Sequence, residues 1–202
     1  MGGIFLGFLC AVVLLAMLGR LRASHPPGGA LGAACWALIA CMGIDGLNAF
    51  LSDGNLAHLY PPNALLRLST GLGAGLAVGL MALPVVASVV WFQPADEYAL
   101  EDPLELVAGL ALIGLVGGLM WVSPSVVLWP VAIAMLAGVL VAFGVANLYV
   151  VVLATARVRK AARFAELRGG LLASLGLALL EIAGLSALRT LLVSTFGFSW
   201  GV

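Results

Sequence analysis

Charged residues are scarce in this chain. Nine basic and nine acidic side chains together make up 9% of its 202 residues and leave a formal net charge of zero. A neutral chain without a basic excess gives no indication of nucleic-acid binding, which depends on a positive surface. Hydrophobic residues account for 63% of the sequence and the mean hydropathy is +1.19, which is more apolar surface than a soluble core of this size could bury.

The motifs that mark common catalytic and metal sites are also missing. The sequence contains no HExxH, no GxSxG, no phosphate-binding P-loop and no Cys-x-x-Cys of a redox or zinc site. Cys10, Cys35 and Cys41 all lie in apolar stretches, where small residues pack between helices. His25 and His58 lie in connections that the topology below places on opposite sides of a membrane. We therefore expect no metal site, and the sequence identifies no cofactor.

Long apolar stretches dominate what is present. A helix needs about 20 residues to cross the hydrocarbon core of a bilayer, and continuous rather than alternating apolar runs favour helices over a β-barrel. The sequence therefore predicts one all-α domain over residues 1–202, a polytopic integral membrane bundle of about six transmembrane helices. The expected spans are Gly3–Leu18, Ala30–Leu51, Leu65–Trp91, Leu104–Trp121, Leu128–Ala156 and Leu171–Phe196.

The basic residues predict how these spans are oriented. Lys and Arg favour the cytoplasmic side of a membrane. The second connection has only Arg67, near its end, and the fourth has no basic residue. With six spans, both termini are then expected on the non-cytoplasmic side. The first and fifth connections together carry seven basic residues, which are Arg20, Arg22, Arg157, Arg159, Lys160, Arg163 and Arg168.

The third and fifth connections carry opposite charges and are expected on the same side. The basic segment 158–167 also has apolar residues between its charges, so we expect it to prolong the fifth helix as far as Gly169-Gly170. Two interpretations of the charges stay open: the two connections pair with one another, or the basic one binds anionic lipid headgroups. The acidic residues of the third connection are Asp96, Glu97, Glu101, Asp102 and Glu105.

Three ionisable residues, Asp45, Glu181 and Arg189, lie inside the apolar spans, where an unpaired charge costs at least about 2.5 kcal/mol, and Arg67 lies near the start of the third span. Counting residues along the helices places Asp45, Arg189 and Arg67 in the outer half of the bilayer and Glu181 deeper. We expect Asp45 to pair with Arg67 or Arg189. Such a cluster either pins the helices together or forms a small polar cavity for a substrate, a proton or a cofactor group. Its expected supporting residues are Asn48, Asn63 and Thr70.

Glycines recur at four-residue spacing in two of the spans. Gly71, Gly75 and Gly79 share one face of the third span, and Gly114 and Gly118 share a face of the fourth. Faces of this kind let neighbouring helices approach closely. They predict a tight bundle or a homo-oligomer, without indicating a ligand.

Several of these residues occur in motifs that resemble a known family. Residues 43–47 read Gly-Ile-Asp-Gly-Leu, residues 63–71 read Asn-Ala-Leu-Leu-Arg-Leu-Ser-Thr-Gly, and Gly75 follows. This pattern resembles the predicted bacterial and archaeal membrane proteins known as DUF2085, over roughly the first 90 residues. The resemblance implies a protein of a prokaryotic inner membrane and no established activity.

The same family has a Cys- and His-containing segment that leads into its first helix. Residues 3–7, Gly-Ile-Phe-Leu-Gly, are similar to the end of that element, and the part with the cysteines does not precede them here. We expect either that the native chain begins upstream of Met1 or that this protein keeps the scaffold alone.

Two classes of function remain open. The first is an accessory or scaffold subunit of a membrane complex, which the short connections, the glycine faces and the missing catalytic motifs favour. The second is a small transporter or membrane enzyme that uses a polar cluster around Asp45, Arg67, Glu181 and Arg189. A secondary transporter is often built from an inverted repeat, and no three-plus-three repeat is evident, so we favour the first class.

Overall fold

The computed structural model describes residues 2–122, 124–156 and 158–196, and within them the chain forms six α-helices. The expected all-α membrane fold is confirmed, because five of these helices are long and apolar enough to cross a bilayer. The helices are α1 (Gly2–Met17), α2 (Gly29–Asp53), α3 (Ala64–Val90), α4 (Pro103–Val122), α5 (Pro124–Ala154) and α6 (Arg168–Phe196). Between them lie the strands β1 (Ala23–His25) and β2 (Ala95–Tyr98) and the 3-10 helix η1 (Phe164–Leu167).

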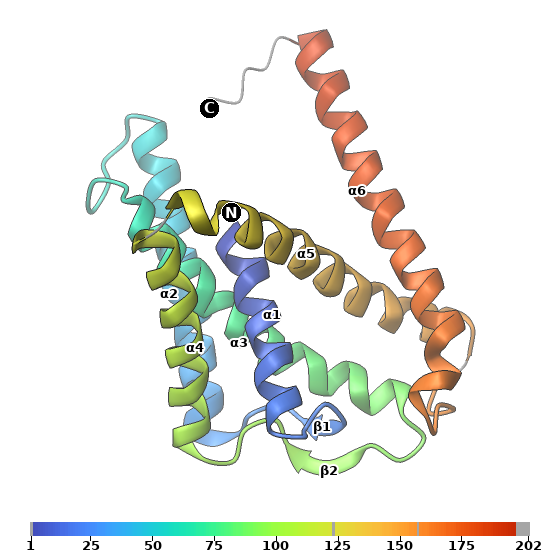
Figure 1. Cartoon of the computed structure of the whole chain (residues 1–202). Helices are drawn as coiled ribbons and strands as arrows, with labels where there is room; N and C mark the ends of the chain where they lie inside the picture. Colours follow the sequence, from blue (N-terminus) through green and yellow to red (C-terminus); the bar gives the residue numbers. More distant parts are fainter. Residues whose placement is uncertain (1, 123, 157, 197–202) are drawn as a thin grey trace.

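The shortest helix, α1, lies in the middle of the bundle (Figure 1). It has 16 residues and spans about 24 Å, less than the hydrocarbon thickness of a bilayer. It packs against α3, α4 and α5, and its side chains Leu6, Leu14 and Leu15 are buried. Because its neighbours cover it, α1 forms the core rather than a lipid-facing wall.

The three glycines of α3 allow this close packing against α1. A Cβ on Gly75 would overlap the carbonyl oxygen of Ile4, and a Cβ on Gly79 would lie 2.5 Å from that of Ala11. Gly71 lies against the start of α1 with slightly more room, 3.4 Å from the nearest atom. The two backbones therefore meet along the face that the spacing predicts.

The two glycines predicted to form a packing face on α4 make no such contact within the described chain. No atom lies within 4 Å of a Cβ placed on Gly114 or Gly118. Helix α4 instead turns Gly109 and Gly117 toward α1 and α3, where added Cβ atoms would lie 3.0 Å from Leu14 and 3.3 Å from Leu72. Gly114 follows Gly109 by five positions and Gly118 follows Gly117 by one, so the helical rotation of about 100° per residue turns both out of this contact face.

The first, third and fifth connections meet at one end of the molecule (Figure 1). Strands β1 and β2 pair in parallel, and the amides of Ala95 and Ala99 donate to the carbonyls of Arg22 and His25, both at 2.8 Å. The Phe92 amide donates to the carbonyl of Ala161 at 2.9 Å, which joins the fifth connection to the third. Successive helices that run in alternating directions bring alternate connections together in this way.

The basic segment does not continue α5, as the sequence had led us to expect. Helix α5 ends at Ala154, and Ala156 and Arg159 adopt positive φ angles of 51° and 54°. The Arg159 amide donates to the carbonyl of Val89 at 2.8 Å, and its side chain donates to that of Ser88 at 3.2 Å. The last carbonyls of a helix have no partner within it, so this segment gains hydrogen bonds by capping α3 instead of extending α5.

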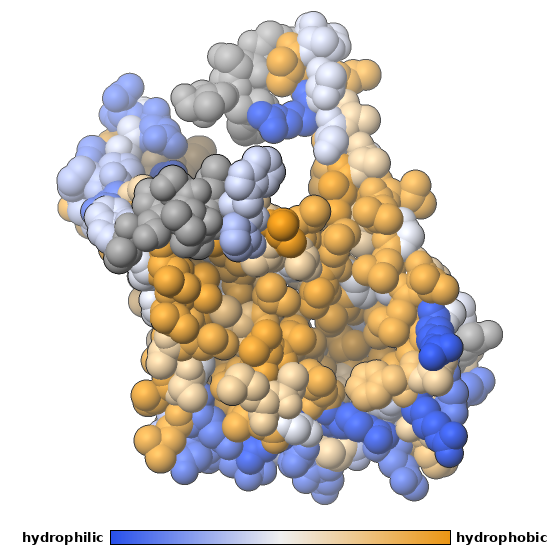
Figure 2. Space-filling model, in the orientation of Figure 1, coloured by the Kyte–Doolittle hydropathy of each residue, from blue (hydrophilic) through white to orange (hydrophobic). Residues whose placement is uncertain are grey.

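The surface is that of a protein embedded in a membrane. Figure 2 shows apolar residues over the middle of the molecule and hydrophilic residues along the end that carries β1 and β2. Hydrophilic residues also gather at the opposite end, around the α2–α3 connection. The start of α1 and the end of α6 lie toward that second end (Figure 1). An apolar band between two polar ends is the surface that a bilayer requires.

Candidate functional site

Asp45 is a buried acidic residue inside the apolar part of the bundle. Its side chain lies on α2 and the residue is 4% exposed. The Tyr60 hydroxyl donates to its Oδ1 at 2.8 Å, and the Thr70 hydroxyl lies 3.3 Å from its Oδ2. The carboxylate is therefore held by hydroxyl groups from the α2–α3 connection and from α3.

The expected ion pair of Asp45 with Arg67 or Arg189 is not formed, and no salt bridge involves Asp45 among the described residues. Arg67 lies three residues before Thr70 on α3 and is exposed, so α3 turns a hydroxyl toward Asp45 rather than a guanidinium. Arg189 lies on α6, which packs on α5 and not on α2. The prediction failed because depth along a helix does not determine which neighbour the helix has.

Asn48, one helical turn after Asp45, holds the α2–α3 connection in place. It is 2% exposed, and its Nδ2 donates to the carbonyl of Tyr60 at 2.9 Å. Its Oδ1 accepts from the amides of Leu59 at 2.7 Å and Tyr60 at 3.3 Å. We call Asp45, Asn48, Tyr60 and Thr70 the α2 clamp, because together they bind the connection to α2 and α3.

The chemistry of the α2 clamp suits structure better than proton transfer. The hydrogen bond to Asp45 raises the pKa of the Tyr60 phenol above its usual range, with smaller contributions from burial and from the charge of Asp45. A general acid or base works best with a pKa near the working pH. A phenol whose pKa moves further from neutrality is a poor catalyst, but it is a stable hydrogen-bond donor.

Asn63 and Arg67 are close to the α2 clamp in sequence, but their side chains form no hydrogen bond with it in the described structure. The Asn63 Oδ1 accepts from the Leu65 amide at 2.9 Å and so caps the first turn of α3. Arg67 lines an open pocket of about 450 Å³ together with Gly2 and Gly3 at the start of α1.

Glu181 forms a separate polar contact between α5 and α6. The Asn147 Nδ2 donates to its Oε2 at 2.9 Å, and Asn147 is 6% exposed. Arg189 lies eight residues further along α6, where it is exposed and surrounded by Leu185, Leu188 and Leu192. The residues of the expected cluster therefore occupy separate places, and only Asp45, Asn48 and Thr70 come together.

The acidic connection pairs with the first connection rather than the fifth. Arg20 bonds to Glu105 at 2.8 Å and to Glu101 at 3.1 Å, and His25 lies 2.8 Å from Asp96. No ion pair joins the acidic connection to the basic segment in the part of the chain that the structure describes. Of the two interpretations left open by the sequence, the pairing of the third and fifth connections is therefore not supported.

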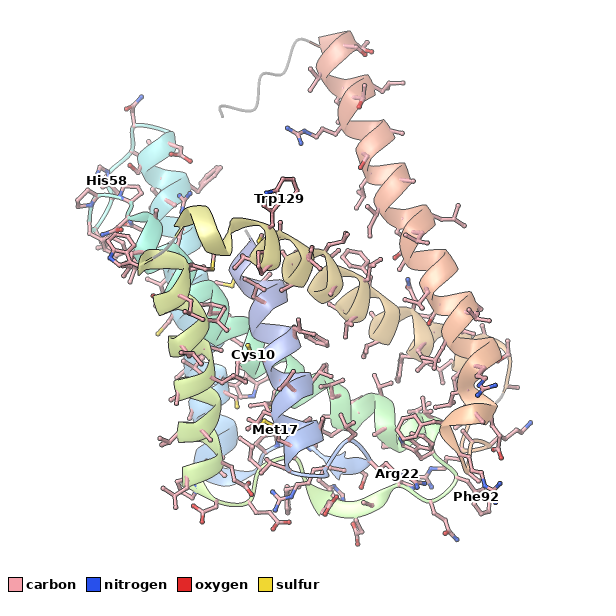
Figure 3. All side chains as sticks on the ribbon, viewed as in Figure 1. Cys10, Met17, Arg22, His58, Phe92 and Trp129 are labelled. Carbon is pink, nitrogen blue, oxygen red and sulfur yellow. The ribbon has the colours of Figure 1, made fainter. Side chains whose placement is uncertain are left out.

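The three connections are nevertheless joined around Trp91. The guanidinium carbon of Arg22 lies 4.4 Å from the centre of its ring, and the ring of Phe164 packs edge-on at 4.6 Å. Trp91 is buried and follows the last residue of α3. Figure 3 shows Arg22 and Phe92 at this end and His58 at the opposite one. The two histidines are thus far apart, as expected.

The described residues contain no group of three or more His, Cys, Asp or Glu side chains that could hold a metal ion. Cys10 and Cys35 are buried free thiols and Cys41 is an exposed one. Figure 3 places Cys10 midway along α1.

Two residues that organise these contacts were missed in the sequence. Tyr60 lies in a connection beside two prolines, and nothing in its position indicates that it reaches Asp45. Asn147 could have been found, because an amide in a long apolar run needs a partner just as a charged residue does.

Comparison with known proteins gives one match. Residues 1–81 match the family model described as a predicted membrane protein (DUF2085), which confirms the resemblance over α1, α2 and most of α3. The match includes the whole α2 clamp. No curated protein and no solved structure matches the chain.

Proposed function

We propose that this protein is an accessory or scaffold subunit that binds another membrane protein through the C-terminal half of α6, residues 183–195. The observation that carries this proposal is the exposure of that half. From Ala183 to Thr195, every side chain except Leu192 is exposed. Figure 1 shows α6 leaving α5 and projecting away from the bundle.

Lipid alone is a poor neighbour for this half of the helix, because Arg189 lies within it. A charged residue inside the hydrocarbon region costs at least about 2.5 kcal/mol and is normally paired or faces a protein interior. No side chain in the described residues forms an ion pair with Arg189. A carboxylate on a neighbouring helix would supply the missing partner.

One face of the same half of α6 suits a close helix contact. At 100° per residue, the small side chains of Ala183, Ala187, Thr190 and Ser194 fall on one stripe of α6. Arg189 lies about 100° around the helix from Thr190, the nearest residue of this stripe, with Ser186 between them. Helices in membranes associate through small-residue faces because they let backbones approach, and hydrogen-bonding groups strengthen the contact. The stripe and the arginine together favour a partner helix that carries an acidic residue.

The alternative of a small transporter or membrane enzyme has less support. It required one polar cavity around Asp45, Arg67, Glu181 and Arg189, whereas these side chains lie apart and Asp45 is held by Tyr60 and Thr70.

Purification of the tagged full-length chain from its native membranes in a mild detergent tests this proposal. We expect the chain to migrate in an assembly larger than one copy, and Arg189→Gln to release it. Arg67→Gln is the matched control, since it removes the same charge from an exposed site outside α6. A chain that migrates alone and binds a solute would instead support the transporter or enzyme class.

A further inference from the structure

A crevice opens between the end of α5 and the start of α6. Its volume is about 500 Å³, and the end of α3 and the segment that precedes α6 complete its walls. The walls are mostly apolar, and four of their side chains, Val90, Val152, Ala161 and Leu167, belong to a buried cluster at this end of the bundle. One basic residue, Lys160, and one acidic residue, Glu166, also line the crevice. We call this space the α5–α6 crevice.

The charge around the α5–α6 crevice is not balanced by the chain. Arg163 and Arg168 flank the same segment, and none of its described basic residues forms a salt bridge within the described part of the protein. Its one acidic residue, Glu166, accepts a hydrogen bond from the amide of Ala162 at 2.8 Å. The acidic third connection does not compensate either, because three of its carboxylates bond to Arg20 or His25 and none pairs with a described basic residue of this segment.

The crevice also lies at the depth where lipid headgroups begin. It is at the end of the molecule that carries β1 and β2, where Figure 2 shows apolar surface giving way to hydrophilic surface. The aromatic rings of Trp91 and Phe164 pack together at the same end. Aromatic residues with basic residues beside them are typical of the interface between hydrocarbon and water.

We propose that the α5–α6 crevice binds an anionic phospholipid, with one acyl chain between α5 and α6 and its phosphate beside Lys160. The apolar walls fit an acyl chain, and the surplus of positive charge at the mouth fits a headgroup with a net negative charge. Basic pockets between transmembrane helices are known to select anionic lipids in this manner. An apolar peptide or a second apolar helix would also fill the crevice, but it would leave the basic residues without a negatively charged partner.

Native mass spectrometry of the full-length protein tests this, after reconstitution with phosphatidylglycerol or with phosphatidylcholine of the same acyl chains. We expect retention of phosphatidylglycerol over phosphatidylcholine. Lys160→Gln should weaken phosphatidylglycerol retention about fivefold, as loss of one basic residue near a membrane surface predicts. Lys160→Arg should restore it, and Ala173→Phe, which fills the crevice without changing its charge, should abolish it.

Two controls keep the proposal open to contradiction. Arg67→Gln removes a basic residue at the opposite end and should leave retention unchanged. Inorganic phosphate should not compete with the lipid, because it lacks the acyl chain. Equal losses from Lys160→Gln and Arg67→Gln, equal retention of the two lipids, or displacement of the lipid by inorganic phosphate would each overturn the proposal.

Discussion

The hydroxyl of Tyr60 donates a hydrogen bond of 2.8 Å to the carboxylate of Asp45. This bond links a residue of the α2–α3 connection to the second half of α2. We expect Tyr60→Phe to lower the melting temperature of the protein in detergent, because Asp45 loses its shortest hydrogen bond. The same substitution should have a smaller effect when Asp45 is already Asn, since residues in direct contact do not act additively.

Arg189 provides the control for this coupling. Asp45→Asn and Arg189→Gln should change the melting temperature additively, because the two side chains lie on helices that do not pack together. Strong coupling between them would mean that the ion pair forms after all.

The raised pKa of Tyr60 predicts its alkaline titration. An ordinary tyrosine ionises near pH 10. Because the neutral phenol is the form that donates to Asp45, the stability from this bond is fully present below the ordinary pKa and is lost as pH rises through the raised one. The difference in phenolate absorbance between the wild type and Tyr60→Phe should therefore develop above pH 10. A midpoint at or below that value would contradict the hydrogen bond.

The glycines of α3 and α4 should respond in opposite ways to an added methyl group. Gly75→Ala places a Cβ on the backbone of Ile4 and should cost about 1–3 kcal/mol, as overpacking usually does. Gly114→Ala meets open space and should be neutral, or stabilising by up to about 1 kcal/mol through helix propensity. Thermal denaturation of both variants in one detergent compares them. Equal destabilisation would show that α4 also packs through Gly114.

The bias of basic residues predicts the orientation of the chain in the membrane. A cysteine introduced at His58 should react with an impermeant thiol reagent added outside intact cells, and one at Ala162 should react only after lysis. The background should carry Cys41→Ser, because Cys41 is exposed whereas Cys10 and Cys35 are buried. Labelling of Ala162→Cys from outside would reverse the assignment of both termini to the non-cytoplasmic side.

Much of the fold could be predicted because it depends on long, local patterns. Continuous apolar runs located all six helices, since a bilayer leaves few other ways to satisfy the backbone. The close approach of Gly75 and Gly79 to α1 also followed from their spacing. The end of α5 could not be predicted in this way, because it depends on hydrogen bonds from Arg159 to α3, which is distant in sequence.

The polar contacts were harder to predict than the helices. The free-energy cost of an unpaired charge in a membrane correctly indicated that Asp45 and Glu181 need partners. It does not show which neighbouring side chain supplies each partner. The choice between Tyr60 and Arg67 depends on how the α2–α3 connection folds back, and that fold depends on Asn48. Likewise, Arg20 and the basic segment could both have paired with Glu105, and the pairing of β1 with β2 brings Arg20 there.

Photo-crosslinking from α6 in native membranes tests the central claim most directly. A photoreactive residue at Ala187 lies on the small-residue stripe, whereas one at the exposed Leu188 lies about 100° around the helix from both Ala187 and Arg189 and serves as the matched control. We predict a discrete adduct from Ala187, none from Leu188, and loss of the Ala187 adduct when Arg189 is replaced by Gln. Adducts with lipid alone from both positions, unaffected by Arg189→Gln, would contradict the proposal that this half of α6 binds a partner.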